Sequence, residues 1–141
     1  MTMTEEQRSR MELVRKLANE SPYYLHLGMA LVSYDEGMAV LEMPFQKCHA
    51  NLYGIAHGGA IASVADSACG LALASRLEPG QTAVTVDLRV NYIAPFTGDV
   101  LVARGEVVHK GGSSAIESAR ITQGNRLVAI ATAVHFIKSQ T

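Results

Sequence analysis

The feature that most constrains the fold is a stretch from His57 to about Arg76, which is rich in Ala and Leu and apolar on nearly every helical face. Pro79 and Gly80 follow and end it. A helix that is apolar all round is normally buried. The rest of the chain must therefore cover a central helix over residues 57–76.

Strand-like segments lie on both sides of this helix. The segments 27–34 and 38–44 are apolar-rich, and Asp35 and Gly37 between them supply hairpin-turn chemistry. Four more strands are expected after the helix, at about 82–92, 99–109, 114–122 and 127–137, and Gly-containing turn signals at 110–112 and 123–125 separate the last three. Tight turns join antiparallel neighbours, so the sequence predicts an α+β fold with an antiparallel sheet of about five to six strands wrapped around the central helix.

Two of these strands carry further information. Residues 82–92 alternate, which predicts a half-buried strand with Val84, Val86 and Leu88 on one side and Thr85 on the other. The segment 127–137 is apolar on both faces, as expected of an interior strand.

The N-terminal 1–20 segment is expected to hold an amphipathic helix. Its apolar residues have helical spacing over 4–19 beside the N-cap candidate Thr4, and Ser21-Pro22 is expected to close it.

Composition limits the class of protein. The 141 residues have a net charge of −1 without a long run of either sign, which argues against nucleic-acid and membrane-surface partners. The sequence shows neither a secretory signal pattern nor an apolar run approaching ~20 residues, so we expect a cytoplasmic protein with one domain over 1–141. Cys48 and Cys69 lack the spacing of metal ligands, so no metal site is expected.

Candidate chemistry concentrates at the start of the central helix. Gly58 and Gly59 there allow a ligand to approach the backbone, and first-turn N–H groups suit a developing oxyanion. Asp66 lies on the same helix among apolar residues, where a buried carboxylate suggests function. Alternatively, hydroxyls such as those of Ser63 or Ser67 satisfy Asp66, or it faces solvent.

The spacing of Gly58 and Asp66 has a consequence for assembly. They are eight residues apart, roughly 12 Å along a helix that rises ~1.5 Å per residue. They cannot flank one carbonyl group within one chain. If both act on one substrate, the site combines two protomers and oligomerisation is required for activity.

The segment NLYGIAHGGA over 51–60, followed by SVAD over 63–66, resembles the hotdog-fold acyl-CoA thioesterases of the PaaI-like, phenylacetate-degradation type. Weaker similarity extends over about 22–137, through segments such as VTVDLRVNYIAP at 84–95. The resemblance implies hydrolysis of aryl-acyl or medium-chain acyl-CoA thioesters by a homo-oligomer, commonly a dimer of dimers. It implies no cofactor, since coenzyme A is part of the substrate.

The same resemblance implies roles for individual residues. Asp66 would be the nucleophile or the general base, and the Gly58 N–H would polarise the thioester carbonyl of a site in the other protomer. His57 and Asn51 would orient the site, and Thr85 would place a hydroxyl facing Asp66. His57 could alternatively be a structural cap. Contacts to the substrate or its CoA part are expected from Gly59, Arg89, Lys110, Gly111, Gly112 and Ser113, where a solvated strand residue and a plain hairpin turn are the alternatives.

The sequence leaves two other functions as alternatives. A hotdog hydratase or dehydratase would also use a carboxylate and a His, but the H-x-x-x-F-P and D-x-N-x-x-H segments of those families are missing from the sequence. A non-catalytic acyl-CoA or acyl-carrier binding module would not need Asp66. The remaining histidines are expected to be surface or packing residues: His26, His49, His109 and His135.

Overall fold

The computed structural model describes residues 2–140; Met1 and Thr141, which the one-domain prediction includes, lie outside this range. The elements follow the order α1 (Glu5–Glu20), α2 (Pro22–Leu27), β1 (Ala30–Asp35), β2 (Met38–Pro44), a 3-10 turn (Lys47–His49), α3 (Gly58–Ala74), β3 (Gln81–Tyr92), β4 (Val100–Lys110), β5 (Ser114–Gln123) and β6 (Arg126–Ser139).

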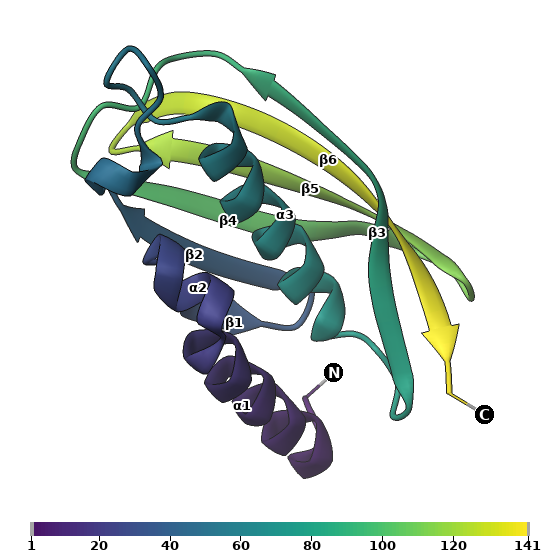
Figure 1. Cartoon of the computed structure of the whole chain (residues 1–141). Coiled ribbons are helices and arrows are strands. Elements are labelled where there is room, and N and C mark those ends of the chain that lie inside the picture. Colours follow the sequence, from purple (N-terminus) through teal and green to yellow (C-terminus); the bar gives the residue numbers. More distant parts are fainter. Residues whose placement is uncertain (1, 141) are drawn as a thin grey trace.

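The six strands form one antiparallel sheet in the order β1-β2-β4-β5-β6-β3, curved around α3 (Figure 1). Helix α3 packs on β2, β3, β4, β5 and β6, and α1 lies beside β1 at one edge. The prediction of an antiparallel sheet around a central helix is confirmed. Strand β3, at the opposite edge, has one side without a strand partner among residues 2–140.

Small residues bring α3 close to the sheet. Val64, Ala65, Ala68 and Cys69 are completely buried against the strands. A Cβ atom added to Gly105 of β4 would lie 2.3 Å from the Ala68 carbonyl oxygen, so only glycine permits this approach. The packing fixes the position of α3, and with it the residues on the helix face turned away from the sheet.

The N-terminal region differs from the expectation in one respect. Thr4 caps α1 in a reciprocal capping box with Gln7, as the N-cap prediction requires. Pro22, however, opens a second helix, because proline at the first helical position gives up only an N–H that has no helical partner. Gly28 ends α2 with a φ of 72°, and the strand expected from residue 27 begins at Ala30.

The predicted alternation of β3 is wrong in its first half. Thr85 pairs with His135 but Asp87 pairs with Val134, so Val86 is the extra residue of a β-bulge. Val84 and Val86 are 59% and 61% exposed, whereas Thr85 points towards α3. The bulge thus places Thr85 on the same face as Leu88, which packs against the core. Strand β6 lies inside the sheet, as predicted.

No helix within residues 2–140 is long and apolar enough to cross a membrane. In the same residues, no group of three or more His, Cys, Asp or Glu side chains is arranged to hold a metal ion.

Candidate active site

Asp66 lies on the side of α3 that faces the edge strand β3 and is partly buried. Its Oδ1 accepts a 2.8 Å hydrogen bond from the Thr85 hydroxyl of β3. Neither Ser63 nor Ser67 supplies this bond: Ser63 donates to the Gly59 carbonyl oxygen, and no hydrogen bond joins Ser67 to Asp66 within residues 2–140. The carboxylate is therefore held by the strand rather than by hydroxyls of its own helix.

A cleft of about 440 Å³ runs along α3 beside Asp66. Its lining combines polar Tyr24, Thr85 and His135 with apolar Leu71 and Ala74. Burial raises the pKa of the Tyr24 hydroxyl, a hydrogen bond with Ser67 lowers it in part, and the Asp66 charge raises it. Tyr24 thus stays protonated and can donate a hydrogen bond at neutral pH.

His135 was expected to be a surface or packing residue without partners; it is a packing residue, but it has two side-chain partners. It is buried, its Nε2 lies 3.0 Å from Thr85 Oγ1, and its Nδ1 lies 2.8 Å from Glu117 Oε2. Glu117 is completely buried. Four side chains from β5, β6, β3 and α3 therefore form one hydrogen-bonded chain that ends at Asp66.

The sequence did not predict this series of hydrogen bonds, because its four residues are far apart along the polypeptide. A signal was present nevertheless, since Glu117 occupies an inward position of β5 between Ala115 and Ala119, both of which are buried. A charged residue at an inward strand position is rarely tolerated without a partner. The sheet register brings β5 and β6 together and places His135 next to it.

The start of α3 forms a second group of candidate residues. His57 is the N-cap, and its Nδ1 accepts a 2.8 Å hydrogen bond from Gly59 N–H, as the capping alternative predicts. The Gly59 N–H is thus engaged, while the Gly58 N–H makes no hydrogen bond within residues 2–140. Gly58 is the free donor of this turn, and its carbonyl oxygen accepts from the Tyr92 hydroxyl at 2.7 Å.

Asn51 stabilises the loop before this turn. Its Oδ1 accepts from the backbone N–H groups of Tyr53 at 2.8 Å and Ile55 at 3.4 Å. Asn51, His57 and Gly58 line one cavity of about 520 Å³. The loop exposes Leu52 and Tyr53, which are 98% and 85% accessible.

The structure thus divides the five candidate catalytic residues into two groups that line different cavities. We call Asn51, His57 and Gly58 the oxyanion half-site, and Asp66 with Thr85 the carboxylate half-site. The division agrees with the roughly 12 Å rise along α3 between Gly58 and Asp66.

The other histidines differ in their surroundings. His26 and His109 are exposed, as expected. His49 is a buried packing residue, although it has backbone partners: its Nδ1 accepts from Gln46 N–H at 3.0 Å, and its Nε2 lies 2.6 Å from the Leu27 carbonyl oxygen.

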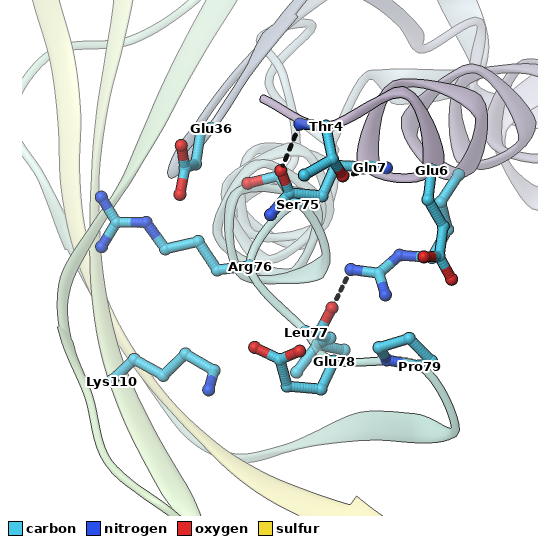
Figure 2. Close-up of a pocket in the computed structure, with 11 residues that line it drawn as sticks. Thr4, Glu6, Gln7, Glu36, Ser75, Arg76, Leu77, Glu78, Pro79 and Lys110 are labelled. Atoms are coloured by element: carbon cyan, nitrogen blue, oxygen red, sulfur yellow. Dashed lines mark hydrogen bonds between the residues drawn. The ribbon is translucent and has the colours of Figure 1, made fainter. Parts of the chain in front are cut away.

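The segments expected to contact CoA lie away from the Asp66 cleft, or their backbone groups already make hydrogen bonds within a turn. Lys110 lines a separate cavity of about 480 Å³ between the start of α1 and the end of α3, and Figure 2 shows it in the same part of that cavity as Glu78. The Gly111 N–H donates to Ser114, and the Ser113 carbonyl oxygen accepts from Ile137, so this segment is largely a hairpin turn. Arg89 is exposed on β3.

Cys69 lies behind the carboxylate half-site and is completely buried. Burial raises the pKa of its thiol to about 12, and the charges of Glu117 and Asp66 add to the rise. A protonated, inaccessible thiol is a poor nucleophile at neutral pH. Cys69 is therefore not placed to act as a nucleophile.

Comparisons with known proteins agree with this architecture. The model of the thioesterase superfamily matches residues 53–130. Acyl-coenzyme A thioesterase PaaI of Escherichia coli K12 is 33% identical over 106 residues, which are 74% of this chain and 74% of that protein. Human acyl-coenzyme A thioesterase 13 is 30% identical over 122 residues, which are 85% of this chain and 86% of that protein.

Solved structures show the same fold. The match to the Escherichia coli PaaI protein covers 99% of this chain and 99% of that one, with a TM-score of 0.85 and 25% identity. A thioesterase family protein of Silicibacter pomeroyi covers 95% of this chain and 99% of its own, with a TM-score of 0.86 and 26% identity. The chain therefore belongs to the thioesterase superfamily, and within it to the PaaI-like proteins of the hotdog fold.

Proposed function

We propose that this protein hydrolyses acyl-CoA thioesters to a free acid and coenzyme A, with Asp66 as the residue that drives the reaction. The observation that carries the proposal is the partly buried Asp66 carboxylate, held by Thr85 at the wall of a cleft. The similarity to acyl-coenzyme A thioesterases of Escherichia coli and human supports the substrate class.

The chemistry needs little more than one carboxylate and one oxyanion donor. Asp66 takes a proton from water, and the water oxygen forms a bond to the thioester carbon. The carbonyl oxygen becomes an oxyanion, which then collapses and breaks the carbon–sulfur bond. Coenzyme A leaves as a thiolate and takes up the proton that Asp66 held, which restores the Asp66 carboxylate. Direct attack by Asp66, through a mixed anhydride, is the alternative use of the same carboxylate.

The single hydrogen bond of Asp66 leaves one carboxylate oxygen free for the reaction. Its Oδ1 is occupied by Thr85, and its Oδ2 makes no hydrogen bond within residues 2–140. One free oxygen is sufficient to accept a proton from water. The oxyanion donor is the unpaired Gly58 N–H.

We further propose that each active site combines the carboxylate half-site of one protomer with the oxyanion half-site of another. A distance of roughly 12 Å along α3 separates Gly58 from Asp66 of the same chain. Strand β3, at the unpaired edge, exposes Val84, Val86 and Tyr92, and the loop between Asn51 and His57 exposes Leu52 and Tyr53. Edge strands with apolar side chains pair readily with a second chain. A twofold pairing of β3 would place the two α3 helices antiparallel, with two equivalent sites. A dimer of dimers is the expected assembly.

The Asp66 cleft suits the acyl group, an aryl or a medium-length alkyl chain. Its apolar wall of Leu71 and Ala74 continues away from the carboxylate, and the Tyr24 hydroxyl adds a polar group. Arg89, Lys110 and Gly112 remain the proposed contacts to coenzyme A, since they offer two cationic groups and a glycine of an exposed turn.

The test measures release of free CoA thiol from a panel of aryl-acyl and alkyl-acyl thioesters. Asp66→Asn is compared with Glu42→Gln, which neutralises an exposed carboxylate on β2 far from the cleft. Assembly of each variant is checked by light scattering. The proposal requires turnover by the wild type and by Glu42→Gln, and its loss in a correctly assembled Asp66→Asn. Binding of the panel without hydrolysis would instead indicate a binding module.

A further inference from the structure

A buried acid and a buried imidazole lie beneath the carboxylate half-site. Glu117 of β5 is 0% exposed and His135 of β6 is 3% exposed, and their Oε2 and Nδ1 atoms are 2.8 Å apart. Replacing buried ionic groups by apolar ones is often neutral or stabilising, so such a pair is weak evidence for a role in stability. Its position next to Asp66 suggests another role.

Within residues 2–140, Thr85 is the one hydrogen-bonding link between this pair and Asp66. His135 Nε2 lies 3.0 Å from Thr85 Oγ1, and Thr85 Oγ1 lies 2.8 Å from Asp66 Oδ1. Helix α3 passes directly against the imidazole, because a Cβ atom added to Gly70 would lie 3.4 Å from His135 Nε2. The ring is thus held from both sides, by the acid and by the helix.

The protons available to Glu117, His135, Thr85 and Asp66 fix the direction of the hydrogen bonds between His135, Thr85 and Asp66. The ionised Asp66 carboxylate can only accept, so the single hydroxyl proton of Thr85 must point to it. Thr85 Oγ1 can then only accept from His135, which requires a proton on Nε2. The bond between Nδ1 and Glu117 contains one further proton, which either atom can hold without changing the other two bonds.

We propose that Glu117 is a positioning residue for the reaction at Asp66. Glu117 and His135 Nδ1 share one proton, either on a protonated Glu117 that donates to Nδ1 or on an imidazolium that donates to Glu117. In both cases His135 keeps a second proton at Nε2, which it donates to Thr85. The Thr85 hydroxyl then cannot donate to the imidazole and donates to Asp66, which leaves Asp66 Oδ2 turned to the cleft. This inference rests on the proposed function, but the direction of the hydrogen bonds can be measured without substrate.

The first readout is the tautomer of His135, from nitrogen chemical shifts of ¹⁵N-histidine-labelled protein. The wild type should show a protonated Nε2 that is lost or exchange-broadened in Glu117→Leu. Glu117→Gln should retain it, because the amide N–H can donate to Nδ1. An unprotonated Nε2 in the wild type would mean that Thr85 donates to His135, which would overturn the inference whatever the enzyme activity.

The second readout is turnover. Glu117→Leu should lower kcat about tenfold, the effect of losing one hydrogen bond at the site, with KM changed less than about twofold. Glu117→Gln should stay within about threefold of wild type. The control is Ser75→Ala, which removes a buried hydroxyl that accepts from Gly37 N–H and donates to the Ala72 carbonyl oxygen near the end of α3.

The control separates positioning from stability. Ser75→Ala should lower the melting temperature and leave kcat unchanged, whereas Glu117→Leu should lower kcat while remaining folded and assembled. Full kcat in Glu117→Leu, or an equal loss in both variants, would overturn the inference while the proposed function stands. A wild type that hydrolyses no acyl-CoA would refute the proposed function itself.

Discussion

The Thr85 hydroxyl donates a 2.8 Å hydrogen bond to Asp66 Oδ1 and so links the edge strand β3 to the central helix α3. The bulge at Val86 makes this link possible, because it turns Thr85 towards the helix. The same strand has the unpaired edge that we propose for dimer formation. Assembly and the position of the carboxylate are therefore connected through one strand.

Replacing Thr85 tests this link. Thr85→Val keeps the shape of the side chain but removes the donor, so kcat for acyl-CoA hydrolysis should fall about tenfold. Thr85→Ser keeps the hydroxyl and should remain within about threefold of wild type. Steady-state thiol release gives both values. Equal kcat in the Val variant and the wild type would show that the hydrogen bond has no role in turnover.

The Gly58 N–H can be removed with little change to the backbone. Proline is well tolerated at the first position of a helix, and His57 before it has the extended conformation, with φ −61° and ψ 138°, that proline requires. Gly58→Pro should lower kcat by about 10²–10³, the usual cost of one oxyanion donor.

Gly58→Ala is the matched control, because it adds a Cβ atom at the same place, 3.2 Å from the Tyr92 ring, but keeps the N–H. It should retain most of the activity. A similar loss in both variants would assign the effect to crowding of Tyr92 and not to the missing donor.

Local patterns were sufficient to predict the central helix, the interior strand β6 and the capping of α1, because each depends on neighbouring residues. Helix α2 was missed, although proline at its first position and glycine at its end are both helix signals. The bulge at Val86 was missed because an insertion of one residue leaves the apolar alternation of the sequence intact and becomes visible only in the pairing with β6.

The candidate site was predictable only where a motif marks it. The segment around His57 and Gly58, with Asp66 on the helix, is local in sequence. Glu117 and His135 are 18 residues apart and come together through the register of β5 and β6. Thr85 is separated from both, so no spacing rule could connect the four residues.

Gly105→Ala should reduce stability strongly. The added Cβ atom would lie 2.3 Å from the Ala68 carbonyl oxygen, so backbone must shift, and overpacking of this kind costs about 1–3 kcal/mol. Gly98→Ala is the control, because its Cβ atom would meet no atom within 4 Å. Urea unfolding of both variants measures the difference. Equal free energies of unfolding would contradict the close contact between β4 and α3.

Stability should fall at alkaline pH partly because of Cys69. Its pKa in the folded protein is raised to about 12 from an ordinary value of 9.0, so the folded state holds the proton more tightly than the unfolded state. Its contribution is complete below pH 9 and is lost as the pH rises from about 9 to 12.

Removal of the thiol checks this contribution. Between pH 9 and 10.5, the free energy of unfolding should fall less steeply in Cys69→Ala than in the wild type, after allowance for a constant offset from the lost side chain. Parallel curves would mean that the thiol of Cys69 does not titrate differently in the folded protein.

The most direct test of the shared active site mixes two inactive proteins. Asp66→Asn and Gly58→Pro homodimers are each expected to lack turnover, but a mixed dimer would contain one site with both native residues and one site with neither. Unfolding and refolding of an equal mixture should give about half mixed dimers and so restore about a quarter of the wild-type CoA-thiol release, by the statistics of closed dimers. No recovery in a mixture shown to contain mixed dimers would place Asp66 and Gly58 outside a common site and contradict the account.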